Sequence, residues 1–386
     1  MFDKFFRRKE EAVVVADIGS GSAAVGVAII AKDRMLITHA ERSALPFEER
    51  TEAQTIAGIG QKLNEVGSKV IAAYAASDTG RHHGAPTRAL AVIRAPWARS
   101  ATEHKEISLP HEISITQKMV EDVARTAMDE ERELERANIF EAGVVRVELN
   151  GYPTSKPKGL MAHTIGTTVL ESDCNPAVRS LVTESFGSFL PGRNVVLRSN
   201  LRALVSAAGN RLKTKRSYLL VDMGSAATSF AAINHDAIEQ HTVIPVGVRT
   251  VLHKIAGPNG LPEETLGLLR MVGNEQCNDG ACMTVATSLT AVEPELMKLF
   301  GEALSKLASV SRLPNLLVLA VHPDMAPWLS HFLSRLDFSQ FTATMRPFSV
   351  ELFTPEALSE KINFEPTATP DTGLAVAAAL FNTSLK

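Results

Sequence analysis

Two stretches of the sequence share one pattern: residues 13–30 read VVVADIGSGSAAVGVAII, and residues 218–233 read YLLVDMGSAATSFAAI. Each has an apolar run, then an Asp, an apolar residue, Gly, Ser, small residues and a second apolar run. Apolar runs separated by Gly and Ser predict two strands joined by a turn. Asp17 and Asp222 take the same place in the two copies. The copies lie too far apart for a solenoid repeat, so they predict two related domains in one chain.

The turns of this repeat favour a phosphate-binding site. Glycine lets backbone N–H groups approach phosphate oxygens closely, and serine hydroxyls add donors. A carboxylate at the strand end would repel a phosphate, but it can hold Mg²⁺ through the water shell of the ion. We therefore predict that Asp17 and Asp222 hold a hydrated Mg²⁺ across a cleft. The residues predicted to face the phosphates are Gly19, Ser20, Gly21, Ser22, Gly224, Ser225, Ala226 and Thr228.

Two other interpretations of the first turn remain open at this point. It can be an ordinary hairpin turn whose Asp bonds the local backbone. It can also be a dinucleotide fingerprint, because residues 19–24 fit G-x-G-x-x-A and Glu41 follows at a suitable distance. That fingerprint should open a helix, whereas residues 24–37 read as strand, turn and strand. It also leaves the second copy of the pattern unexplained.

The composition excludes several classes of function. The chain has 386 residues, of which 45% are hydrophobic and 22% charged, with a net charge of −3. This is ordinary for a globular protein and gives no sign of nucleic-acid binding. No apolar run reaches the roughly 18 residues of a membrane span. The three cysteines are few and no secretory signal precedes them, which favours a reducing cytoplasm. We expect Cys277 and Cys282 to be incidental thiols, the alternatives being a redox pair or half of a metal site.

The distribution of apolar periodicity, Gly and Pro predicts an α/β protein of several parts. Residues 12–76 and 166–213 are predicted to form a first domain, residues 77–165 an inserted α+β subdomain, and residues 214–370 a second domain. Residues 371–386 are predicted to form a C-terminal helix that returns to the first domain.

With both loops identified, the chain resembles the actin-like ATPase superfamily, and within it the FtsA family of bacterial cell division. The order of elements carries the resemblance: DIGSGS, an inserted subdomain with ITQKMVEDVARTA and NGYPTSKPKGLMAH, then VDMGSAATS and IPVGVRTVLHKIA. The PilM family of type IV pilus assembly has the same layout and is the nearest alternative. The resemblance implies two ribonuclease-H-like domains around a nucleotide cleft, with a small α+β insert in the first domain.

The resemblance to FtsA also implies a function. The chain would bind ATP with Mg²⁺, self-associate into a polymer, and tether the tubulin-like protein FtsZ to the cytoplasmic membrane during formation of the septum. No general base is evident, so we expect slow hydrolysis of ATP or none. A true ATP-dependent enzyme such as a sugar kinase is a further alternative, which would need a catalytic Asp.

Two departures from the family pattern support a third interpretation, a degenerate actin-like protein without nucleotide binding. Ser229 stands where the second loop of the family usually ends in Asp. After LLVLAV, the family has a Gly-rich turn against adenosine, whereas this chain has His322 and Pro323. Proline removes a backbone donor there and histidine adds bulk.

The N-terminal segment, residues 1–11, is predicted to bind the membrane in place of the C-terminal amphipathic helix of the FtsA family. Its aromatic and basic residues suit an anionic leaflet, at about 1 kcal/mol for each basic residue near the surface. We therefore expect a cytoplasmic protein that is peripheral at the inner face of the membrane. The predicted membrane-binding residues are Phe2, Lys4, Phe5, Phe6, Arg7, Arg8 and Lys9.

Overall fold

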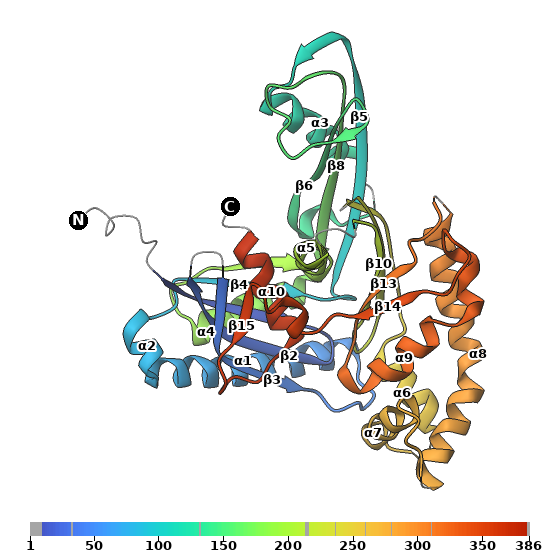
Figure 1. Cartoon of the computed structure of the whole chain (residues 1–386). Helices are drawn as coiled ribbons and strands as arrows, with labels where there is room; N and C mark the ends of the chain where they lie inside the picture. Colours follow the sequence, from blue (N-terminus) through green and yellow to red (C-terminus); the bar gives the residue numbers. More distant parts are fainter. Residues whose placement is uncertain are drawn as a thin grey trace.

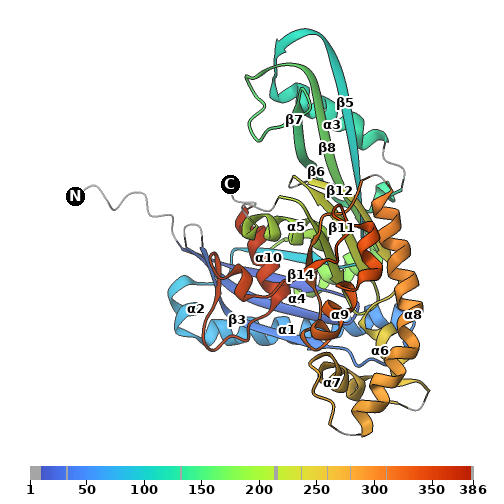
Figure 2. The same ribbon diagram turned by 45° about the vertical axis from the view of Figure 1, so that its right-hand side comes forward.

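The computed structural model is built from three β-sheets with helices packed on them. In Figure 1 two of the sheets lie in the lower part of the molecule, and the third projects from them; Figure 2 shows the same arrangement from a second side. The structure describes residues 10–31, 34–130, 133–212, 216–235, 237–258, 260–278, 280–309 and 311–383.

The first sheet has six strands in the order β15-β3-β2-β1-β4-β9. The first three strands of the chain pair antiparallel as a meander, and β4 and β9 add in parallel on the other side of β1. Strand β1 is buried almost throughout, in keeping with its continuous apolar run. The strands are β1 (Glu11–Ile18), β2 (Ser22–Ala31), β3 (Arg34–Ala44), β4 (Arg88–Ile93), β9 (Val195–Ser199) and β15 (Ile362–Phe364).

Helices cover both faces of this sheet. Helices α1 and α4 pack with one face in a common core, and α5 and α10 pack on the other face. Helix α1 begins with a capping box, in which Thr51 and Gln54 bond each other's backbone N–H groups. The helices of this part are α1 (Glu52–Ala76), α2 (Asp78–His83), α4 (Pro176–Phe189), α5 (Asn200–Arg211) and α10 (Thr372–Thr383).

The second sheet has five strands in the order β12-β11-β10-β13-β14. Helices α6 to α9 share one core with it. The strands are β10 (Tyr218–Met223), β11 (Thr228–Asn234), β12 (Ala237–Ile244), β13 (Leu316–Ala320) and β14 (Ser349–Leu352). The helices are α6 (Val248–Ala256), α7 (Pro262–Gly273), α8 (Gly280–Ala308) and α9 (Ala326–Leu333). Short 3₁₀ turns lie at Arg136–Asn138, Pro323–Met325, Leu336–Phe341 and Glu356–Leu358.

The two main sheets have the same topology. The order β3-β2-β1-β4-β9 in the first corresponds strand by strand to β12-β11-β10-β13-β14 in the second. In each, an antiparallel meander is followed by two parallel strands. The duplication predicted from the sequence is therefore confirmed. The dinucleotide fingerprint is wrong, because the segment after its glycines is strand β2 rather than a helix.

Both sheets contribute to one core around α5 and α10. Val13 and Val15 from β1, Leu220 from β10 and Leu204 from α5 belong to the same buried cluster. Most of α10 also lies in this cluster, and its small side chains let it pack closely. The carboxyl ends of β1 and β10, where the two Asp residues lie, therefore have fixed positions relative to each other.

The third sheet forms the projecting subdomain, with the order β5-β8-β6-β7 and one helix on it. Its elements are β5 (Ala98–Ser114), α3 (Gln117–Glu130), β6 (Ile139–Leu149), β7 (Tyr152–Pro153) and β8 (Met161–Cys174). These bounds differ from the expected insert, residues 77–165. Strand β4 falls inside that range but pairs with β1 in the first sheet, because its apolar run is buried there despite the nearby Gly and Pro.

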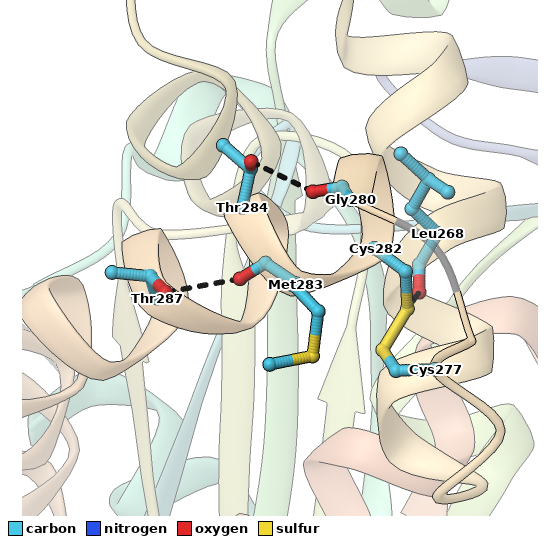
Figure 3. The surroundings of a disulfide bond; sticks show 7 residues. All are labelled: Leu268, Cys277, Gly280, Cys282, Met283, Thr284 and Thr287. Carbon is cyan, nitrogen blue, oxygen red and sulfur yellow. Dashed lines mark hydrogen bonds between the residues drawn. A yellow bond between two sulfur atoms is a disulfide. The ribbon is translucent and has the colours of Figure 1, made fainter.

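The structure contains a disulfide between Cys277 and Cys282, so the expectation of two incidental thiols is wrong. Figure 3 shows the bond joining the segment after α7 to the first turn of α8. The Cα atoms lie 5.4 Å apart, within the usual range for a disulfide. Cys282 is buried, and Cys174 is a free, buried cysteine.

Among the described residues, no helix is long and apolar enough to cross a membrane. The residues predicted to bind the membrane surface, Phe2 to Lys9, lie outside the described part of the chain.

Candidate functional site

The two Gly/Ser turns have the same local geometry. In the first, Gly19 N donates to Ser22 O at 3.0 Å, and in the second Gly224 N donates to Ala227 O at 2.9 Å. Asp17 pairs in register with Ala24, and Asp222 takes the corresponding position in β10. Both carboxylates are buried, with 0% and 4% of their residue surface exposed.

Arg94 joins the two carboxylates. It follows β4 directly, and β4 runs parallel to β1, so Arg94 and Asp17 leave adjacent strands at the same sheet edge. Its Nε donates to Asp17 Oδ1 at 2.8 Å, and its Nη1 donates to Asp222 Oδ1 at 2.9 Å. One guanidinium therefore bridges the corresponding acids of the two halves of the molecule.

Arg42 holds the other oxygen of Asp17. Its Nη2 donates to Asp17 Oδ2 at 2.7 Å, and its Nη1 donates to Ser22 Oγ at 2.7 Å. The same guanidinium binds both oxygens of Asp371, at 2.5 and 2.8 Å. Asp371 Oδ1 also accepts from Leu374 N at 2.8 Å, so this carboxylate caps the first turn of α10. The contacts of Arg42 connect β3, the first loop and α10.

The second oxygen of Asp222 accepts from Asn200 Nδ2 at 2.7 Å. Asn200 is the first residue of α5 and is buried, and its Oδ1 has no hydrogen-bond partner among the described residues. Asn200 and Asp222 line a small cavity of about 20 Å³, enough for about one water molecule. Ser229 and His241 line the same cavity.

The network contains three carboxylates and two guanidiniums, so its net charge is −1 when all five groups are ionised. Burial alone would raise the pKa of Asp17, but Arg94 and Arg42 together lower it to about 2. Burial raises the pKa of Asp222, and Arg94 offsets this only in part. The unequal shifts follow from the contacts, since Asp17 has two guanidinium partners and Asp222 has one.

These residues do not fit a hydrated Mg²⁺ in this arrangement. The carboxylates predicted to face the water shell of the ion have all four oxygens engaged by Arg94, Arg42 and Asn200. The guanidinium of Arg94 lies between the acids that would share the ion. Among the described residues, no group of three or more His, Cys, Asp or Glu side chains could hold a metal.

The two loops predicted to face phosphates also lie in contact with each other. A Cβ added to Gly21 would lie 2.4 Å from Ser225 Cβ, so the first loop packs directly on the second. Glycine is required at position 21 because any side chain would collide there. The backbone carbonyls of Gly224 and Ser225 accept from Val248 N and Arg249 N at the start of α6.

The hydroxyls predicted to face phosphates have mixed surroundings. Ser22 Oγ is held by Arg42, and Thr228 is buried, with its hydroxyl donating to Val246 O at 2.6 Å. Ser20 is also buried, and its Oγ has no hydrogen-bond partner among the described residues. The structure places Gly19, Ser20, Gly21, Gly224, Ser225 and Ala226 in two adjoining turns, and Ser22 and Thr228 at the first residues of the strands that follow these turns.

Sequence reasoning missed Arg94, Arg42, Asp371 and Asn200. Arg94 lies in a stretch rich in Gly and Pro, a composition typical of a domain boundary. One signal was available: Arg94 directly follows the apolar run ALAVI, as Asp17 follows VVVA. Charged residues that end neighbouring buried strands meet at one sheet edge, so opposite charges there indicate an ion pair.

The comparisons with known proteins identify the fold. No family model and no curated protein matches the chain. A chain of the PilM–PilN type IV pilus biogenesis complex matches with a TM-score of 0.61 and 13% identity, over 97% of this chain and 99% of that chain. This chain has an actin-like ATPase fold.

Two other solved structures match with TM-scores below 0.5 and carry no argument about function. EutJ, an ethanolamine utilization protein from Carboxydothermus hydrogenoformans, has a TM-score of 0.40 and 12% identity, covering 96% of this chain and 89% of that chain. A protein with actin-like ATPase fold and unknown function from Bacteroides thetaiotaomicron has a TM-score of 0.32 and 11% identity. That match covers 85% of this chain and 98% of that chain.

We expect stability to depend on His241 at mildly acidic pH. Burial lowers the pKa of His241 to about 4 from its usual 6.5. The folded state therefore keeps this histidine neutral while the unfolded chain binds a proton, and stability falls as the pH drops below 6.5. Between pH 7 and 5 the loss should be about 2 kcal/mol, at 1.36 kcal/mol per pKa unit.

Urea unfolding of wild type and His241→Gln across that range measures this contribution. The His241→Gln variant should lose less stability between pH 7 and 5 than wild type does. His111→Gln, at an exposed position of β5, should lose as much stability as wild type. An identical pH dependence of all three proteins would show that His241 does not titrate as described.

Proposed function

We propose that this chain is an actin-like scaffold that acts by binding a protein partner and does not depend on ATP. The observation that carries the proposal is the similarity to a chain of the PilM–PilN complex over nearly the whole length of both chains. The ion-pair network supports independence from ATP, because Arg94 and Arg42 already pair with the two acids that would otherwise share Mg²⁺.

We further propose that the partner resembles PilN and that the chain belongs to an assembly of the type IV pilus kind. The matching structure is a complex of PilM with PilN, which supports a partner of that type. Tethering of FtsZ at the septum and self-association into a polymer stay predictions from the resemblance to FtsA. No observation on the described residues favours them over the pilus role.

Fluorescence anisotropy tests the proposal. A labelled N-terminal peptide of the PilN-like protein from the same organism is titrated with the full chain, with and without Mg–ATP. We expect saturable binding with the same Kd in both conditions. A labelled C-terminal tail of FtsZ from that organism is the matched comparison. Binding of the FtsZ tail alone would contradict the pilus role and support the division role.

We also propose that the chain acts at the inner face of the cytoplasmic membrane through its N-terminal segment. The proposal rests on three aromatic and four basic residues among positions 2–9. Sedimentation with anionic and neutral vesicles measures the binding. We expect the full chain to bind the anionic vesicles, and a variant with Lys4, Arg7, Arg8 and Lys9 changed to Gln to bind several-fold more weakly. Equal binding of both proteins would contradict this location.

A further inference from the structure

We propose that Arg94, assisted by Arg42, is a built-in substitute for a metal-bound nucleotide and holds the two halves of the molecule together without any ligand. This role belongs to the chain by itself and does not depend on the identity of a partner. The residues of the site do not fit the Mg–nucleotide that the fold suggests, and Arg94 lies where that ligand would be.

The position of Arg94 supports a bridging role. Its two donors point to different halves of the molecule, Asp17 at the end of β1 and Asp222 at the end of β10. A cation bound between these acids would have to make the same two connections. The Arg94 side chain is largely buried, with 18% of its surface exposed, so solvent screens these contacts only weakly.

The charges of the site support the same role. Asp17 and Asp222 are buried acids at the sheet edge, and each would destabilise the folded state without a positive partner. With Arg94 and Arg42 present, the network needs no further cation, since the acid in excess, Asp371, is also bonded to the α10 backbone. Without Arg94, two buried carboxylates would face one space. Divalent cations bind hard oxygen ligands such as these two carboxylates.

The remaining contacts make the connection rigid. Arg42 ties Asp17 to Asp371 and to the first loop, and the loops touch at Gly21 and Ser225. Asn200 holds the other side of Asp222. These contacts hold the two loops against each other without a ligand.

Arg94→Gln should gain the ability to bind a divalent cation. Glutamine keeps part of the volume but removes the charge, so the two acids should recruit the ion. The thermal unfolding midpoint of wild type should not change with millimolar MgCl₂ or Mg–ATP. The midpoint of Arg94→Gln should be lower without metal and should rise on addition of MgCl₂. Arg81→Gln, which removes an exposed ion pair with Asp78, is the matched control and should behave as wild type.

Calorimetric titration of wild type with Mg–ATP completes the test and does not require the variant to fold. Absence of binding heat supports the proposal that Arg94 takes the place of a metal-bound nucleotide. Saturable binding of Mg–ATP to wild type would overturn it, as would an Arg94→Gln variant that folds but gains no response to MgCl₂. Either failure is distinct from failure of the partner-binding part of the proposed function, because no partner is present in these measurements.

Discussion

Replacing Arg94 with Met should lower the free energy of unfolding by about 3–5 kcal/mol, the usual effect of removing one partner of a buried ion pair. Methionine retains much of the packing volume, so the loss of stability measures the contribution of the guanidinium charge. Asp17 would keep Arg42, but Asp222 would keep only the amide of Asn200. Urea unfolding followed by circular dichroism gives the value.

Arg81→Met is the control for this prediction. Arg81 also pairs with a carboxylate, but both side chains are mostly exposed. Exposed pairs contribute little, so this variant should unfold close to wild type. If Arg94→Met unfolds as wild type does, the bridge carries no net stability and the account of the site fails.

Replacing Gly373 with Ala should destabilise the protein by about 3 kcal/mol, although Gly→Ala inside a helix normally stabilises by about 1 kcal/mol. Gly373 lies in the first turn of α10, and an added Cβ would lie 2.0 Å from Asp17 Oδ2. The same Cβ would lie 2.8 Å from Arg42 Nη2. The methyl group would therefore have to displace the buried ion pair of Asp17 with Arg42.

Gly301→Ala in α8 separates this collision from helix propensity. Nothing lies within 4 Å of the Cβ position at Gly301. That variant should be as stable as wild type or slightly more stable, measured in the same urea experiments. A Gly373→Ala protein more stable than wild type would show that Asp17 and Arg42 do not lie against α10 as described.

The fold could be predicted from the sequence because its decisive signal is local and occurs twice. Asp17 and Asp222 each follow an apolar run and precede a Gly/Ser turn, so one short pattern predicts both hairpins and the relation between the domains. The order of elements then indicates an actin-like fold. Strand β4 was missed because Gly and Pro on both sides of a short apolar run are typical of a loop as well as of a buried strand.

The chemistry of the site could not be predicted in the same way. Arg94 and Asp371 become neighbours of Asp17 only after β4 has paired with β1 and α10 has packed behind it. No spacing in the sequence records those contacts. A carboxylate that ends a strand before a Gly/Ser turn has the same local sequence whether it faces a hydrated metal or a guanidinium, so only the tertiary structure identifies its partner.

A crystal structure of the wild-type chain grown with saturating MgCl₂ and ATP would show whether Arg94 or a metal-bound nucleotide lies between Asp17 and Asp222. We predict electron density for the Arg94 guanidinium between Asp17 and Asp222, with Gly21 against Ser225 and no nucleotide between the loops. Density for Mg²⁺ and ATP phosphates between the two acids, with Arg94 turned away from them, would contradict the role of Arg94 as a substitute for the metal-bound nucleotide.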